Sequence, residues 1–188
     1  MSFLKYIFLI YIFCGSIYSQ INININQIID LPLEITNNEF QSTNLSVSTT
    51  GYYFLDNINR QVAFLSNDND IVFAGGYGID NDAFIDPIEI LSSKLNVWVV
   101  DRTENKVTEF DHKLNYLRTI EFDAIYPDFC GIDNWGNILL QSELEQIIVK
   151  STLSVEIFTD FIDLSLWQEI NDCLLDMHVS SDGSIGLL

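Results

Sequence analysis

The chain has 188 residues, of which 48% are hydrophobic, with many Ile, Phe and Tyr residues, so a well-packed domain is expected and disorder is not its main theme. Eight Lys and Arg against 27 Asp and Glu give a formal net charge of −19. Because binding to nucleic acids and anionic lipids depends on Lys and Arg, this balance excludes both as primary partners. A cationic partner or Ca²⁺ fits the charge better, although acidity that serves only solubility is the favoured interpretation.

Residues 1–19 are predicted to be a secretory signal peptide, which places the mature chain outside the cytoplasm, either periplasmic or secreted. Lys5 precedes an apolar run from Tyr6 to Cys14, and Ser19 is available at the cleavage position. The run is shorter than the roughly 20 residues that cross a bilayer, which disfavours an uncleaved anchor. Phe13 before Cys14 disfavours a lipoprotein signal.

Residues 20–41 are predicted to form an amino-terminal strand or a linker. Ile21, Ile23 and Ile25 alternate with asparagines, a period of two that suits a half-buried strand. Pro32 makes the following segment an edge strand or a connector.

Residues 42–188 contain a repeat with a period of 40 to 47 residues, which is typical of units of four short strands. The residues that follow or end the second strand of each copy are Asp56, Asp101, Gln141 and Leu188. Apolar residues suited to the innermost strand are Leu45, Ile90, Cys130 and Met177. The turn before the second strand is held by Gly51, Asn96, Gly136 and Gly183. The second strands are expected to bury Tyr53 and Leu55, Trp98 and Val100, Ile138 and Leu140, and Ile185 and Leu187.

The copy from Gly75 to Phe122 is the most complete. It has a glycine-rich turn and then four short strands separated by turn residues, which predicts one antiparallel meander.

This copy resembles one blade of an NHL-repeat β-propeller. The resemblance rests on residues of a structural pattern: Phe84, Pro87, Ile90, Val99, Asp101, Asn105, Lys106, Val107, Phe110 and Asp111. The first copy keeps Asp56, Asn59, Arg60 and Val62, whereas the third has Gln141 in place of the aspartate. The resemblance implies an all-β propeller of four-stranded antiparallel blades, with about three and a half blades present.

Three and a half blades do not readily close a ring, so a truncated part of a longer, six-bladed protein is expected. Two alternatives stay open, namely completion of the fourth blade by the amino-terminal strand and self-association of two chains through the open propeller edge. An insertion from Phe158 to Asp176 is predicted to carry one short helix, because Ser165 and Gln168 are spaced as a capping box. This helix either binds a ligand or covers one end of the core.

No catalytic, cofactor-binding or metal-binding residues are predicted. Only His112 and His178 are present, one in a turn and one entering a strand. The stretches 68–70 and 80–82 offer carboxylates without the spacing of a calcium loop, so they are interpreted as turns. Residues 75–78 lack the Lys and helix of a phosphate cradle and are interpreted as a connection between blades.

Aromatic residues and cysteines complete the set of candidates. Tyr52, Tyr53, Phe54, Trp98 and Trp135 would stack on sugars if they faced the channel, but aromatics on strands more often fill the space between blades. Cys130 and Cys173 are expected to be buried free thiols rather than a disulfide.

The favoured hypothesis is therefore a non-enzymatic binding or scaffold module that holds a protein, peptide or glycan on the loops of one propeller face. The alternative is a fragment of a propeller enzyme, a lyase or hydrolase, whose active-site blades are missing. The shortage of histidine and of polar residues on the innermost strands favours binding.

Overall fold

The structure is a computed structural model that describes residues 31–37, 39–123, 125–151, 157–167, 173–180 and 182–188. Residues 32–188 form one unit by their contacts. The predicted signal peptide and the alternating segment from Ile21 to Ile25 lie outside the described residues.

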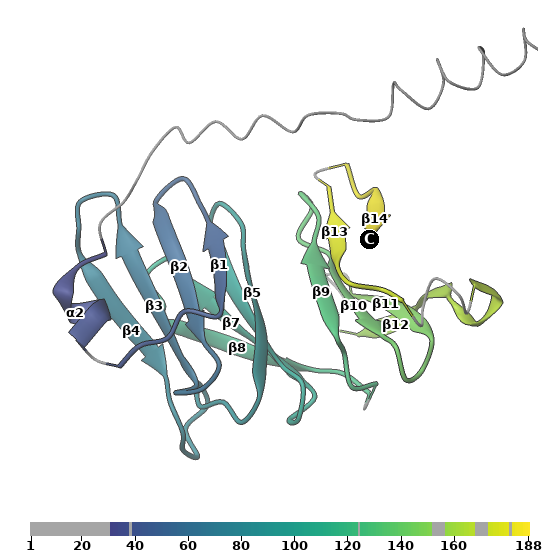
Figure 1. Ribbon diagram of the computed structural model, residues 1–188, viewed down its shortest axis with the longest axis horizontal. Helices are drawn as coiled ribbons and strands as arrows, with labels where there is room; N and C mark the ends of the chain where they lie inside the picture. Colours follow the sequence, from purple (N-terminus) through teal and green to yellow (C-terminus); the bar gives the residue numbers. More distant parts are fainter. Residues whose placement is uncertain (1–30, 38, 124, 152–156, 168–172, 181) are drawn as a thin grey trace, which may run out of the picture. The chain divides into compact units, whose positions relative to one another are not determined.

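The described chain folds into three four-stranded antiparallel sheets and one two-stranded sheet, each a simple meander (Figure 1). Blade 1 consists of β1 (Asn44–Val47), β2 (Gly51–Asp56), β3 (Gln61–Ser66) and β4 (Ile71–Gly75). Blade 2 consists of β5 (Pro87–Ser92), β6 (Asn96–Asp101), β7 (Lys106–Asp111) and β8 (Tyr116–Glu121). Blade 3 consists of β9 (Phe129–Ile132), β10 (Ile138–Ser142), β11 (Ile147–Ser151) and β12 (Phe158–Asp163). Blade 4 is represented by β13 (Met177–Val179) and β14 (Ile185–Leu187).

The blades follow one another through their innermost strands, as in a β-propeller: β1 contacts β5, β5 contacts β9, and β9 contacts β13. Ser46 Oγ and Ser92 Oγ, 2.7 Å apart, join the first two of these strands by a hydrogen bond. Gly131 lets β13 approach β9, because a Cβ at this position would lie 2.3 Å from Cγ2 of Val179. The predicted architecture of about three and a half blades is confirmed.

The period-two pattern of β6 explains how one strand serves two interfaces. Val97 and Val99 belong to the apolar cluster between blades 1 and 2, whereas Trp98 and Val100 belong to the cluster between blades 2 and 3. Successive side chains of a strand point to opposite faces of its sheet, so all four are buried.

The predicted burial fails on two of the strands. Ile90, Cys130 and Met177 are buried, but Leu45 is 51% exposed, and Leu187 is also exposed. Leu45 is exposed because no described blade packs against the face that carries it. Leu187 pairs with Met177 on the face that packs against blade 3, yet only Met177 is buried there.

The segment after Pro32 is a short helix, α2 (Leu33–Asn37), rather than an edge strand. The Pro32 carbonyl accepts hydrogen bonds from the amides of Ile35, at 3.1 Å, and Thr36, at 3.2 Å. Ile35 is 2% exposed and packs on Phe54, Ala63 and Leu65. The helix therefore covers part of the outer face of blade 1.

The predicted helix in the insertion is represented by a 3-10 turn, η1 (Ser165–Trp167), while residues 168–172 lie outside the described chain. Leu166 is exposed, and Leu164 is buried against Leu139, Ile148 and Met177. Phe158–Asp163, predicted as the start of the insertion, is instead β12 of blade 3, so the insertion begins after this strand. Its described part contributes to the core through Leu164.

A buried aspartate ends the second strand of blades 1 and 2 and explains why the repeat keeps it. The Asp101 carboxylate accepts hydrogen bonds from the amide of Ile85, at 2.6 Å, and from that of Glu104, at 3.0 Å. Asp56 binds the amides of Gln41 and Asn59 at 2.7 and 2.8 Å in the same way. Each carboxylate thereby joins the segment that leads into its blade to the turn after the second strand.

Blade 3 makes this connection with different groups. Asp128, on the segment that leads into the blade, accepts a hydrogen bond from the Glu143 amide at 2.8 Å, and its own amide donates to the Gln141 carbonyl at 2.8 Å. The substitution of the repeat aspartate by Gln141 therefore does not disconnect the two segments.

We expect Asp101→Ala to lower the free energy of unfolding by about 3 kcal/mol, because it removes a buried acceptor that the amides of two segments share. Asp123→Ala is the matched control, since Asp123 is exposed and should change stability by less than about 0.5 kcal/mol. Urea unfolding followed by circular dichroism measures both. Equal midpoints for the two variants would contradict the role assigned to Asp101.

Ile35→Ala should cost about 2 to 4 kcal/mol, because it removes a buried side chain from the cluster under α2. Leu33→Ala changes a residue of the same helix that is 69% exposed and should cost less than about 0.5 kcal/mol. Thermal unfolding of the two variants provides the comparison, and a similar loss in both would show that α2 does not cover blade 1 through Ile35.

Candidate functional site

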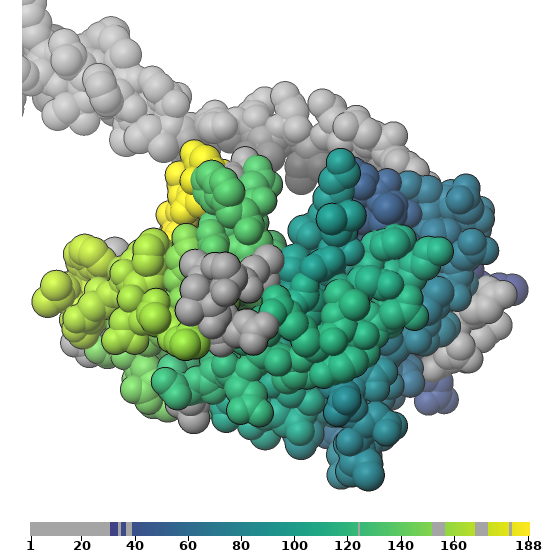
Figure 2. All heavy atoms as spheres, turned by 180° about the vertical axis from the view of Figure 1, so that it is seen from behind, coloured from purple at the N-terminus to yellow at the C-terminus, as the bar shows by residue number. Residues whose placement is uncertain are grey.

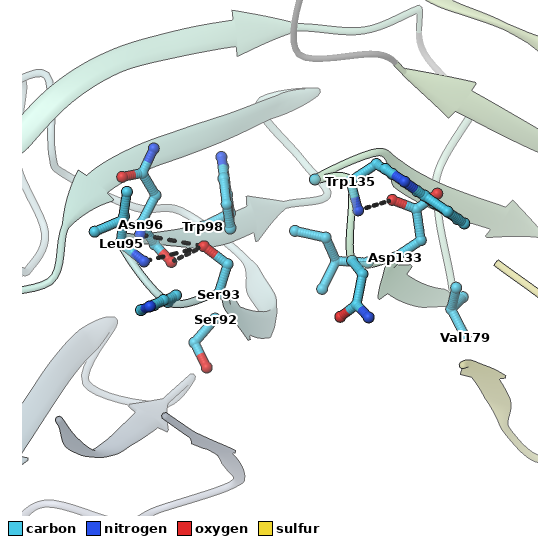
Figure 3. A pocket seen from close by; sticks show the side chains of 12 residues that line it. Ser92, Ser93, Leu95, Asn96, Trp98, Asp133, Trp135 and Val179 are labelled. Carbon is cyan, nitrogen blue, oxygen red and sulfur yellow. Dashed lines mark hydrogen bonds between the residues drawn. The ribbon is translucent and has the colours of Figure 1, made fainter. Parts of the chain in front are cut away.

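A cavity of about 490 Å³ opens between the β5–β6 hairpin of blade 2 and the β9–β10 hairpin of blade 3. Figure 2 shows the surface hollowed between the tips of these teal and green hairpins. In Figure 3, Ser92, Leu95, Asn96 and Trp98 lie on one side, with Trp135 and other residues of blades 3 and 4 opposite. Three blades contribute to its lining, because Val179 comes from β13.

Both hairpin loops are held by their own side chains. In the β9–β10 loop, Asp133 accepts hydrogen bonds from the amides of Trp135 and Asn137, both at 2.9 Å, and from Asn137 Nδ2 at 2.6 Å. Gly136 completes the turn with a φ of 81°, which is costly for other residues. In the β5–β6 loop, Ser93 Oγ accepts from the amides of Leu95 and Asn96. The loop tips are therefore fixed before any ligand arrives.

Apolar side chains are exposed at the mouth of the cavity and buried at its wall. Trp135 is 66% exposed and Leu95 is 68% exposed, whereas Trp98 is fully buried and its Nε1 has no hydrogen-bond partner. The ring of Trp135 lies beside the β13–β14 turn, where a Cβ at Gly183 would be 3.2 Å from its Cζ3. Large exposed apolar groups beside a cavity are typical of binding sites.

The charges of the cavity are unequally accessible. Asp133 is buried, and Lys150 Nζ lies 3.4 Å from its Oδ2. Burial opposes ionisation of Asp133, but hydrogen bonds from Asn137 and Trp135 and the nearby Lys150 hold its pKa below the ordinary value. Lys94 is exposed, and no described acidic residue forms an ion pair with it. The accessible charge is therefore positive in a strongly acidic protein.

Two further cavities lie on the same face, which is formed by the loops between first and second strands and between third and fourth strands. One, of about 360 Å³, lies between the β1–β2 and β5–β6 loops and shares Ser92, Ser93 and Lys94 with the first. The other, of about 670 Å³, has Lys113 and His112 but also Asp68 and Asp70 in its lining. The face thus has two cavities that meet at Lys94 and a third of mixed charge.

A half-buried carboxylate, Glu89, lies on the innermost strand β5. Burial raises its pKa to about 7, an effect that nearby Asp176 increases, whereas hydrogen bonds from Asn44 and from the Ile90 amide oppose it. Glu89 was not among the predicted site residues, because the innermost strands were predicted from their apolar positions and Glu89 lies at an alternate position. Its proximity to Asn44 requires β1 and β5 to be side by side, which the sequence alone does not position.

The residues considered at the sequence level are dispersed among the described blades. His112 lies in the turn after β7 and His178 is exposed on β13. No group of three or more potential metal-ligating His, Cys, Asp and Glu side chains occurs in the described part of the chain. Residues 68–70 form part of the turn between β3 and β4, and Gly75 and Gly76 begin the connection to blade 2.

The aromatic residues and cysteines differ partly from expectation. Tyr53 and Trp98 fill the space between blades, but Trp135 is at the cavity mouth, because it belongs to a turn rather than a strand. Cys130 and Cys173 are free thiols, as predicted. Cys130 is buried, which raises its pKa, but Cys173 is exposed, contrary to the prediction, because it lies in a turn outside the strands.

None of the described helices has the length and apolar character required to cross a bilayer.

Comparison with known proteins supports the fold. No family model and no curated protein sequence matches the chain. Among solved structures, a catalytically inactive virginiamycin B lyase from Staphylococcus aureus with quinupristin is similar with a TM-score of 0.64 and 17% identity, over 88% of this chain and 54% of that one. YCF48 bound to D1 peptide is similar with a TM-score of 0.57 and 9% identity, over 80% and 48%.

The third similar structure is hydrazine synthase of Kuenenia stuttgartiensis, with a TM-score of 0.57 and 9% identity, over 86% of this chain and 44% of that one. The chain thus spans about half the length of these proteins. At such low identities, the similarity supports the β-propeller fold and not a shared activity.

Because the folded pKa of Glu89 is raised from 4.5 to about 7, the folded state binds more protons than the unfolded state between these values. Its contribution to stability is present below pH 4.5 and is lost as the pH rises through 7. Glu89→Gln should therefore raise the free energy of unfolding at pH 8 by on the order of 1 to 2 kcal/mol, after allowance for solvent screening, and change it little at pH 5. Glu121→Gln, on an exposed residue, is the control. Equal effects of Glu89→Gln at the two pH values in urea titrations would disprove this linkage.

Proposed function

We propose that the protein is an extracytoplasmic binding module with NHL-type blades, which holds a peptide, protein or glycan ligand in the cavity between blades 2 and 3. The single observation that carries the proposal is the pairing of a fixed, hollowed surface with exposed apolar side chains, Trp135 and Leu95, at its mouth. Such a surface is suited to recognition, since loops on a rigid scaffold lose little conformational entropy on binding. The extracytoplasmic location is supported by the predicted signal peptide of residues 1–19.

The site favours binding over catalysis because of the state of its polar groups. The Asp133 carboxylate already accepts hydrogen bonds from Asn137 and Lys150, and Asn96 Nδ2 donates a hydrogen bond to Glu109. Neither a histidine nor an accessible carboxylate is among the described residues that line this cavity. A general acid or base, which must reach the substrate, therefore has no candidate among its described lining residues.

A second candidate function is that of a propeller enzyme, and Glu89 is the observation that favours it. A carboxyl with a pKa of about 7 can act as a general acid or base near neutral pH. The similarity to virginiamycin B lyase is consistent with this alternative. A hydrolase or lyase activity that disappears in Glu89→Gln but persists in Trp135→Ala would favour the enzyme over the binding module.

The proposal is tested with arrays of immobilised peptides and oligosaccharides, probed with the wild-type protein and two tryptophan variants. For any immobilised ligand that the wild-type protein binds, Trp135→Ala should lower the affinity at least tenfold, because it removes the exposed ring at the cavity. Trp167→Ala is the matched control, since Trp167 is also exposed, at 52%, but lies in η1. Both variants should unfold at the temperature of the wild type. If all three proteins bind the immobilised ligands equally, or if none of them binds any ligand, the cavity is not the binding site.

A further inference from the structure

The two cavities that meet at Lys94 share one loop and one accessible charge. Ser92, Ser93 and Lys94 line both, with Ser48 and Thr49 on the side of blade 1 and Asn134 and Trp135 on the side of blade 3. Asp133 is the other charged residue in the two linings, and it is buried beside Lys150. A ligand that spans both cavities therefore meets a positive charge between two walls of hydroxyl and amide groups.

The main-chain amides that close these hairpin loops are already occupied. The amide of Ser48 donates to the Gly51 carbonyl, that of Ser93 to the Asn96 carbonyl, and that of Asp133 to the Asn137 carbonyl. Recognition of a peptide backbone by strand addition needs free amides and carbonyls along an edge. The loops thus favour a ligand that is bound by side chains.

An indole ring beside hydroxyl and amide groups matches the two faces of a sugar. Trp135 offers a large, exposed ring that lies beside Gly183, and the apolar C–H face of a pyranose can lie on it. The hydroxyls of Ser48, Ser92 and Ser93 already take part in hydrogen bonds within the protein. The side chains of Thr49 and Asn134 form no hydrogen bond with another described residue, and both can donate to and accept from sugar hydroxyls. The ammonium of Lys94 adds a partner for a carboxylate, and no described acid competes for it.

We propose that the twin cavities around Lys94 bind an acidic oligosaccharide, with a sugar ring on Trp135 and the carboxylate of a uronic acid at the Lys94 ammonium. This inference rests on the proposed binding function and specifies the ligand class of the same site. The attraction is local, because the net charge of the whole chain is −19 and at 0.15 M salt charges farther than about 8 Å apart are largely screened.

Two soluble ligands, a tetramer of galacturonic acid and a tetramer of galactose as its neutral counterpart, are titrated against the full chain by isothermal calorimetry. Binding of the full chain to a peptide array is measured alongside. The acidic tetramer should bind at least fivefold more tightly than the neutral one at low salt, and the difference should shrink at high salt. Lys94→Gln should reduce the affinity for the acidic tetramer about fivefold and leave that for the neutral tetramer unchanged.

Lys113→Gln is the matched control, because Lys113 is an exposed lysine of the same face that lines the third cavity and has no described acidic partner. It should change neither affinity by more than about twofold. Trp135→Ala should weaken both tetramers at least tenfold. All three substitutions are at exposed side chains, so circular dichroism and melting temperatures should match the wild type.

The outcomes separate this inference from the proposed function. Equal binding of both tetramers, or equal effects of Lys94→Gln and Lys113→Gln, would overturn the assignment of an acidic sugar. Binding of peptides, but not of either tetramer, in a manner lost in Trp135→Ala would overturn the glycan inference and leave the binding function intact. Absence of Trp135-dependent binding to every probe would overturn both.

Discussion

The buried carboxylate at the end of the second strand is the constraint on which blades 1 and 2 depend, and in blade 3 Asp128 makes the corresponding connection. A blade has three tight hairpins that position themselves, but the longer segment that leads into it has no partner strand. Asp101 and Asp56 each fasten this segment to the turn after the second strand, by two or more short hydrogen bonds to backbone amides. Amides of two separate segments thereby share one buried acceptor, so a single residue fixes where the chain enters the blade.

The successive interfaces follow from this fixed connection. Once the segments before β5 and β9 are held, the alternating side chains of β6 meet blade 1 on one face and blade 3 on the other. The loops at one end of the blades are then brought beside each other, and the cavities form between them. The candidate site is in this sense a product of blade packing rather than of any local motif.

Much of the fold could be predicted from the sequence, because the features that specify a blade are local and recur. Turn residues, period-two apolar strands and the aspartates recur together, and they identified Val97 to Val100, which lie within β6, and the equivalent residues of the other copies as second strands. The exposure of Leu45 could not be predicted, since it depends on which blade packs against which face. A strand has the same period-two apolar pattern whether or not a neighbouring blade covers its face.

The site was less accessible to prediction, since its residues come from hairpins that are some forty positions apart in the sequence. Trp135 gave a signal as an aromatic residue in a turn, but only the structure brings it to the cavity that Leu95 and Lys94 also line. Glu89 gave none, because a single glutamate in an acidic chain is unremarkable until burial changes its pKa. Sequence patterns specify each blade separately, whereas the candidate site lies between blades.

The internal hydrogen bonding of the loops has a consequence for how such a surface can evolve. Asp133 and Ser93 hold their turns by binding amides of the loop, while the side chains of Asn134, Trp135 and Lys94 project from the tips. Residues that shape a loop are therefore different from residues that a ligand would touch. Mutations at the tips can alter specificity without a loss of stability, so the same scaffold can be adapted to new ligands one hairpin at a time.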